Sequence, residues 1–425
     1  MQQFVTLALS PRGGRAVARL LKTLAWLLPN GRFPSANGGQ WWWLRIGLYE
    51  LRRPREQADD WVWMIDHTIQ TGQGKCFVVF AFRLSVWRRK IEESLARDPD
   101  SVPSLEHRDL SVWMIERVES SSGEVVREPL ERWSRETGVE PCGVLSDQGA
   151  DVRHGGEKFS SVADRQTVLL HDISHAVANA LKRQLAQCPH WAKFLADANH
   201  SQTKLRQTHG AFLMPPELKA KARWMNLEPL VAWSQRVLTF LDHPQAGLER
   251  AESSLTPEQL AEKMGWLREH SEAIQHWTTL MQAASTTLNV VRVNGDHEST
   301  PEVLRERLAK FTNGPARALC DEVEAFVRTQ SLLARDQRLP GSTEILESLI
   351  GKGKQLTGST RNGFTKSLLA LAATVSDLTT QTIEAALNST PVRDVQTWIT
   401  DNLGLSLQSQ KQRAFAPITT GTKPE

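Results

Sequence analysis

The chain has 425 residues, a hydrophobic fraction of 40% and a formal net charge of +3 at pH 7. That length predicts two or three domains, and the apolar content is adequate for packed cores. No run of about 18 uncharged apolar residues occurs, so no membrane-spanning helix is expected. The four cysteines are scattered without a CxxC pattern, which argues against a disulfide framework and a cysteine-ligated metal. Free thiols in a reducing, cytoplasmic compartment of bacterial type are expected instead.

Positive charge is concentrated at the N-terminus. Residues 1–55 hold nine Arg and Lys side chains and a single acid, Glu50. A basic end on a near-neutral chain suggests a polyanionic partner, most often nucleic acid. A solvated basic surface is the alternative interpretation.

Two helices are expected in this basic region. Apolar residues at helical spacing cover 15–28 and 40–53, and a loop rich in Gly, Pro, Ser and Asn separates them. The pair resembles a helix-turn-helix module, although its loop is longer than the usual turn. A helical cap on the next domain is nearly as good an interpretation. The candidate DNA contacts on the second helix are Arg45, Arg52 and Arg53.

A run of strands follows the basic region. Segment 61–71 is an apolar β-run with one carboxylate, Asp66, in its middle, and a tight turn at Gly72–Gly74 leads into a second strand over 75–85. The further elements expected are a strand over 109–119, a helix over 127–138, a strand over 142–149, a helix over 157–164, a strand over 167–171 and a helix over 172–185. This order predicts an α/β fold with a mixed sheet and helices on its faces.

Helical periodicity dominates the rest of the chain, where 289–293 is the best strand candidate. A capped helix begins near residue 343 and carries Glu344 and Glu347 on one face. Helices are also expected over 364–387 and 392–403, and residues 417–425 look disordered. The expected domains are a helical DNA-binding region 1–57, the first part of a core 58–188, an all-helical insertion 189–338, the completion of the core with C-terminal helices 339–410, and a disordered tail 411–425.

Three acids stand out by their context. Asp66 lies in a strand, where burying a charge without a partner costs roughly several kcal/mol. Asp66 is therefore expected either to be paired or to hold a cation. Asp147 lies at a strand end, where ligands gather in open α/β sheets. Glu347 lies on the late helix. Two divalent cations about 3.5–4 Å apart require such shared carboxylates, and carboxylates suit Mg²⁺. The sequence thus suggests in-line displacement at phosphorus.

The order of these motifs resembles the DDE transposases of the RNase H-like superfamily. In that family the first Asp lies on the first strand, the second lies just after the fourth strand, and a Glu lies on a late helix. Glu347 follows Asp147 by 200 positions (347 − 147), which is similar to members with a helical insertion before the Glu, including the hAT-like group. That group also has a Cys-or-Asp-x-x-His motif. The matching segments are Asp66-His-Thr, Leu145-Ser-Asp147-Gln-Gly149-Ala-Asp151, Asp172-Ile-Ser-His175 and Glu347-Ser-Leu-Ile-Gly-Lys-Gly-Lys354.

The resemblance covers about residues 60–360 and implies an RNase H-like mixed sheet with an all-α insertion domain. It implies that Asp66, Asp147 and Glu347 bind two Mg²⁺ or Mn²⁺ ions. His175 would lie beside the scissile phosphate or steady the site, and a helix-start histidine bonded locally is an equally good interpretation. Asp151 and Glu344 are the nearest substitutes for the metal-binding acids; Asp151 is otherwise a turn residue and Glu344 a first-turn acid that complements the helix dipole.

The function expected from this resemblance is that of a DNA transposase. It would cleave and transfer strands at transposon ends, with transposon ends and target DNA as partners and a homodimer on DNA as the assembly. Lys352 and Lys354 would touch DNA phosphates, or else are simply exposed. Two alternatives are a transposase-derived DNA-binding protein that does not cut and an RNase H-like nuclease without transfer activity.

Overall fold

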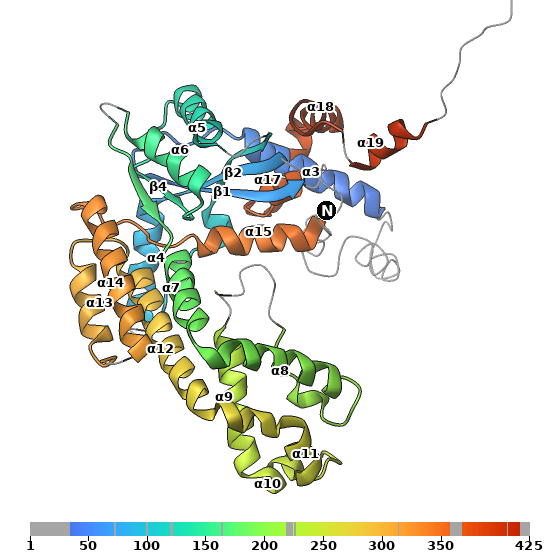
Figure 1. The fold of residues 1–425 in the computed structure, drawn as a ribbon. Coiled ribbons are helices and arrows are strands. Elements are labelled where there is room, and N and C mark those ends of the chain that lie inside the picture. The colour runs from blue at the N-terminus through green and yellow to red at the C-terminus, as the bar shows by residue number, and fades with distance from the viewer. Residues whose placement is uncertain are drawn as a thin grey trace, which may run out of the picture. The chain divides into compact units, whose positions relative to one another are not determined.

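The computed structural model describes residues 35–416, except 72–73, 99–100, 120–121, 163–164, 218–223, 225–226, 313, 358–367 and 406. The helix expected over 15–28 and the disorder expected over 417–425 lie outside these residues. The chain divides into two compact units (Figure 1). The first unit comprises Met1–His171 and Thr343–Glu425, and the second comprises Asp172–Ser342. The second unit is therefore inserted in the sequence of the first, directly before the helix that carries Glu347.

The first unit contains a five-stranded mixed sheet with the strand order β3-β2-β1-β4-β5. The three N-terminal strands pair antiparallel, whereas β1 pairs with β4 and β4 with β5 in parallel. The parallel pairings follow from the helices that connect these strands, since a parallel pair requires a crossover connection. The mixed α/β sheet expected from the sequence is confirmed at this level. The strands are β1 (Trp61–Thr71), β2 (Gly74–Arg83), β3 (Ser111–Val118), β4 (Gly143–Ser146) and β5 (Val168–His171).

Helices α5 (Gly123–Thr137) and α6 (Ala150–Ser160) lie on one side of this sheet, as Figure 1 shows. Side chains alternate along a strand, so every second residue of β1 faces these helices. The shared core includes Trp61, Trp63, Ile65, Val126, Leu130, Val152 and Phe159. The two helices approach closely because a Cβ at Gly155 would collide with Val126. The same alternation turns Asp66 to the other face of the sheet.

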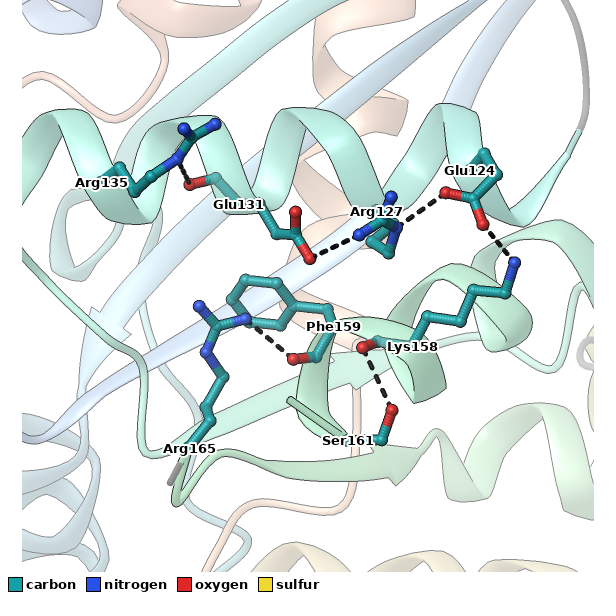
Figure 2. Close-up of polar contacts among 8 residues, drawn as sticks. All are labelled: Glu124, Arg127, Glu131, Arg135, Lys158, Phe159, Ser161 and Arg165. Atoms are coloured by element: carbon teal, nitrogen blue, oxygen red, sulfur yellow. Dashed lines mark hydrogen bonds and ion pairs between the residues drawn. The ribbon is translucent and has the colours of Figure 1, made fainter. Parts of the chain in front are cut away.

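Charged residues link α5 and α6 on their outer surface (Figure 2). Glu124 pairs with Arg127 at 2.7 Å and also with Lys158, and Arg127 reaches Glu131 at 2.9 Å. These side chains are partly to fully exposed, and ion pairs at the surface contribute only about 0–1 kcal/mol each. The two helices are therefore held mainly by their apolar contacts, and the charges form a solvated outer face.

Helix α3 (Ala36–Arg52) is packed into the first unit by the C-terminal helices α16 (Leu368–Ala373) and α17 (Thr380–Ser389). A side chain at Gly47 would collide with the backbone of Leu369, so glycine permits the close approach. The remaining described helices of this unit are α4 (Leu84–Arg97), η2 (His107–Asp109), α15 (Glu344–Thr357), α18 (Val392–Leu403) and α19 (Leu407–Ala414). Helix α19 thus extends four residues into the segment for which a disordered tail was expected.

The helix expected over 364–387 is interrupted in its described part. Helix α16 ends at Ala373, and α17 begins only at Thr380, after its N-cap Thr379. The hydroxyl of Thr374 donates to the Leu371 carbonyl at 2.7 Å, and the Thr379 hydroxyl accepts from the Thr382 amide. Short polar side chains compete in this way with helical backbone bonds.

The second unit is entirely helical apart from its turns and one isolated β-bridge, in the part of it that is described. Its two ends meet, because the amide of Ile173 donates to the Gly341 carbonyl at 2.9 Å. Aromatic rings fill its core, with Trp277 at 4.9 Å from Trp191 and 4.7 Å from Phe194 between ring centroids. The elements are α7 (Ile173–Ala186), α8 (Pro189–Leu205), η3 (Ala211–Leu213), α9 (Glu228–Asp242), α10 (Pro244–Arg250), α11 (Pro257–Met264), η5 (Gly265–His270), α12 (Ser271–Asn294), α13 (Thr300–Leu308) and α14 (Gly314–Ala334).

The strand expected over 289–293 is wrong. These residues lie in the last turns of α12, a helix of 24 residues. Val290 and Val291 are buried against neighbouring helices, so tertiary packing outweighs the strand preference of β-branched residues. Among the helices described, none combines the length and the apolar character needed to span a membrane.

Candidate active site

Asp66 and Asp147 occupy neighbouring positions in the sheet. Ile65 on β1 pairs with Ser146 on the parallel strand β4, and the two aspartates are the next residue on each chain. Neighbouring strands lie about 4.7–4.9 Å apart, so the two carboxylates start from adjacent backbone positions. Both residues are partly exposed. Sequence motifs that are 81 positions apart (147 − 66) are thereby brought together.

A backbone amide holds one oxygen of each carboxylate. The His67 amide donates to Asp66 Oδ1 at 2.6 Å, and the Gly149 amide donates to Asp147 Oδ1 at 3.0 Å. A Cβ at Gly149 would lie 2.9 Å from Asp147 Oδ1, so glycine leaves room for this short turn. These local bonds limit the rotation of both side chains, which is what a pre-formed ligand pair requires.

A second polar cluster lies on the opposite face of the sheet, and it joins His67, Lys75 and Asp151. Lys75 Nζ is 2.9 Å from Asp151 Oδ2, and His67 Nδ1 is 3.4 Å from the same oxygen. The cluster ties β1, β2 and the first turn of α6 together next to Asp147. Asp151, the expected substitute ligand, is thus engaged with a lysine.

The imidazole of His67 is kept neutral by its surroundings. Burial is the main cause that lowers its pKa below the ordinary value of 6.5. The charges of Asp151 and Asp147 oppose this shift, whereas the charge of Lys75 adds to it. Its Nε2 is buried and has no hydrogen-bond partner. Strand alternation predicts that His67 points away from Asp66. The contact of His67 with Asp151 depends on the packing of α6 against the sheet, and no local sequence pattern predicts it.

Glu347 lies in the first turn of α15, in the same unit as the two aspartates. Its amide donates to the Thr343 carbonyl at 3.1 Å, and Glu344 begins the same helix. The oxygens of Asp66, Asp147 and Glu347 do not all lie within 4.8 Å of one another. A single Mg²⁺ with ligands at about 2.0–2.1 Å needs that spacing, whereas two ions about 3.5–4 Å apart need a wider one.

His175 lies in the first turn of α7, in the second unit. Asp172 is the N-cap of this helix: its Oδ2 accepts from the His175 amide at 3.0 Å and lies 2.7 Å from His175 Nδ1. The local bonding considered from the sequence is therefore present. A proton on Nδ1 that is held by a carboxylate leaves the lone pair on Nε2, which is the tautomer found in metal-binding histidines.

The candidate DNA contacts on α3 have partners inside the first unit. Arg45 donates through Nε to the Thr390 carbonyl at 2.6 Å and through a second nitrogen to the Leu387 carbonyl. Arg52 pairs with Asp394 at 3.3 Å, and Arg53 with Glu50 at 3.5 Å. Arg45 thus anchors α3 to the C-terminal helices. Lys352 lies on α15, and the side chain of Lys354 is outside the described residues.

One residue that the sequence analysis did not single out contacts the Glu347 helix. His107, in η2, places Nε2 at 3.2 Å from Ser348 Oγ. The two residues are 241 positions apart, and no local pattern predicts their contact.

The sequence matches no protein-family model and no curated protein.

Proposed function

We propose that the protein is a metal-dependent DNA strand-cleaving and strand-transferring enzyme of the DDE transposase type. The observation that carries this proposal is that Asp66 and Asp147 each directly follow one member of the Ile65–Ser146 pair of β1 and β4. Two carboxylates at adjacent backbone positions of neighbouring strands are oxygen ligands of the kind that Mg²⁺ and Mn²⁺ prefer. Bound there, the ions would activate a water or a 3′-hydroxyl and neutralise the leaving oxygen at the scissile phosphate.

The arrangement of elements supports an RNase H-like fold for the first unit. The first acid is on the first strand, the second follows the fourth strand, and the third is on a helix that comes after a helical insertion. This is the order in which the resembling family carries its three acids. Glu347 is the third ligand in this proposal, and Asp66 and Asp147 are the first two.

The protein residues have separate roles in this proposal. Backbone amides of His67 and Gly149 orient the two aspartates, and the His67–Asp151–Lys75 cluster ties β1, β2 and α6 together beside them. Within the second unit, Asp172 holds the ring of His175 at the start of α7. Because two transposon ends require two active sites, the protein acts as a homodimer on DNA.

The test is a nicking assay with supercoiled plasmid and Mn²⁺ or Mg²⁺, compared with the same reaction in EDTA. Metal-dependent nicking by the wild-type chain that Asp66→Asn and Asp147→Asn both abolish supports the proposal. Adding a short duplex with a free 3′-hydroxyl to the reaction distinguishes a transposase from a nuclease. A transposase joins the duplex to the plasmid, whereas a nuclease only nicks the plasmid. The exposed neighbour Asp59 supplies the matched control, Asp59→Asn, which is expected to nick at the wild-type rate.

The second candidate is a transposase-derived protein that binds DNA without cutting it. This alternative needs no shared ion, and the spacing of the three acids, which exceeds what one ion requires, is compatible with it as well as with two ions. In the same assay it gives plasmid retention on a gel without nicks at any metal concentration.

A further inference from the structure

A polar contact joins η2 to the exposed side of α15, beside the proposed third ligand. His107 Nε2 meets Ser348 Oγ at 3.2 Å, and Ser348 directly follows Glu347. Lys352 comes four residues after Ser348, so both lie on one face of the helix. Ser348 is exposed, and His107 and Lys352 are partly exposed. These three residues, which we call the α15 polar cluster, form one surface in the first unit.

The acids of η2 are already balanced by cations. Glu106 pairs with Arg108 at 2.8 Å and with Lys90 at 3.5 Å. Asp109 pairs with Lys90 at 3.3 Å and accepts the Glu106 amide at 2.7 Å. His107, the histidine of η2, faces α15 instead. Within the α15 polar cluster, the only formal charge is the positive charge of Lys352.

The donor set of the cluster suits a phosphate oxygen. Lys352 supplies an ammonium charge, and the hydrogen-bonded pair of His107 and Ser348 supplies one free donor. This donor is the Ser348 hydroxyl if the ring donates to Oγ through Nε2, or the ring Nδ1–H if the hydroxyl donates to Nε2. Burial, and secondarily the charge of Lys352, lower the pKa of His107 below its ordinary 6.5, so the ring contributes a hydrogen bond and no charge near neutral pH. Lysine together with hydroxyl and ring donors is a common phosphate-contact set, which fixes DNA register without reading sequence.

We infer that the α15 polar cluster of His107, Ser348 and Lys352 is a binding site for a DNA backbone phosphate, next to Glu347. This inference rests on the proposed function and adds His107 and Ser348 to it as ligand-binding residues. The bound phosphate lies beside the one that is cleaved, so the cluster sets the position of the strand along α15.

The experiment measures binding without catalysis. A fluorescein-labelled DNA duplex of arbitrary sequence is titrated with the full-length protein by anisotropy, in EDTA, over a series of KCl concentrations. Loss of one phosphate contact lowers the slope of log K against log[salt] by about 0.9. Lys352→Gln is expected to lower the slope by about that amount. Ser348→Ala and His107→Ala are expected to weaken binding with the slope unchanged, because neither removes a charge.

Two further variants complete the design. Ser348→Glu, at an exposed position, adds a negative charge to the cluster and is expected to weaken binding more than Ser348→Ala does. Lys158→Gln removes a lysine of α6 that is ion-paired with Glu124 (Figure 2), and is expected to leave affinity and slope at wild-type values. An unchanged slope for Lys352→Gln, or wild-type binding by Ser348→Glu, overturns the inference.

The outcome is separable from that of the proposed function. If the protein binds DNA through the cluster but never nicks in Mn²⁺ or Mg²⁺, the inference stands as a DNA site and the catalytic proposal fails. If nicking depends on Asp66 and Asp147 while the cluster variants bind normally, catalysis stands and the cluster is structural.

Discussion

Asp66 and Asp147 are neighbours because each directly follows one member of the Ile65–Ser146 pair on two parallel strands. Neither position requires an acid for the sheet to form, since the flanking residues of β1 and β4 supply the apolar core. Carboxylates that start from adjacent backbone positions can share a divalent cation, which takes oxygen ligands. Their presence together is therefore the strongest indication of a functional site in this chain.

Asp66→Asn and Asp147→Asn are each expected to lower the nicking rate by more than about 100-fold, since even the outer-shell partner of a metal ligand contributes about 10–100-fold. The amide keeps the shape of the side chain, so DNA affinity in EDTA is expected to stay within about twofold of wild type. The rate is followed on gels and the affinity by anisotropy. Loss of DNA binding together with nicking contradicts a purely metal-binding role.

Asp151→Asn distinguishes the metal ligands from the cluster behind them. Because Asp151 is engaged with Lys75 and His67, its loss is expected to lower nicking by about 10-fold, the lower end of the range for supporting residues. The free energy of unfolding is expected to fall by about 1 kcal/mol. Urea denaturation and the nicking assay measure the two effects. A loss of nicking as large as that of Asp66→Asn would make Asp151 a ligand.

Arg45 is expected to act on stability and not directly on DNA. It is hydrogen-bonded to the carbonyls of Thr390 and Leu387, and bonds from a charged group contribute about 1.5–3 kcal/mol. Arg45→Ala is expected to destabilise the protein by about that amount in urea denaturation. The control Arg89→Ala removes a largely exposed pair with Glu93 and is expected to cost less than about 1 kcal/mol. Equal stability of both variants contradicts the anchoring role.

Asp296 gives the second unit a pH-dependent stability. Burial, with the charge of Asp172 as a second cause, raises its pKa from 3.8 to about 8. The folded state therefore binds a proton that the unfolded state releases between about pH 4 and pH 8, so this residue lowers stability as pH rises through that window. Asp296→Asn removes the titration.

The measurement for Asp296 is urea denaturation of both chains at a series of pH values. The stability of Asp296→Asn relative to wild type is expected to rise steadily from pH 4 to pH 8 and then to level off. A difference between the two chains that does not change with pH contradicts a raised pKa for Asp296.

The sequence predicts well what depends on local pattern. Apolar runs of strand length give β1 and β2, and the cap at Asp172 gives the start of α7. Contacts between distant segments are not predictable in this way. Val290 and Val291 suggest a strand until the packing of α12 is known, and the contact between His107 and Ser348 depends on the folded first unit.

The same distinction applies to the candidate site: its residues can be selected from the sequence, whereas their arrangement cannot. Strand position was sufficient to select Asp66 and Asp147, because a polar residue in or directly after a buried strand is unusual. The register that brings them together is a property of the paired strands, and the sequence does not contain it. Arg45 shows the opposite case, since a basic helix suggests nucleic acid whereas its hydrogen bonds lie within the protein.

The most direct test of the central claim is the anomalous scattering of Mn²⁺ in crystals of the full-length protein. A peak is expected at about 2.0–2.2 Å from oxygens of both Asp66 and Asp147, and no peak is expected there in crystals of Asp147→Asn. A well-ordered crystal in millimolar Mn²⁺ with no peak between these two carboxylates, or with a peak only at other residues, would contradict it.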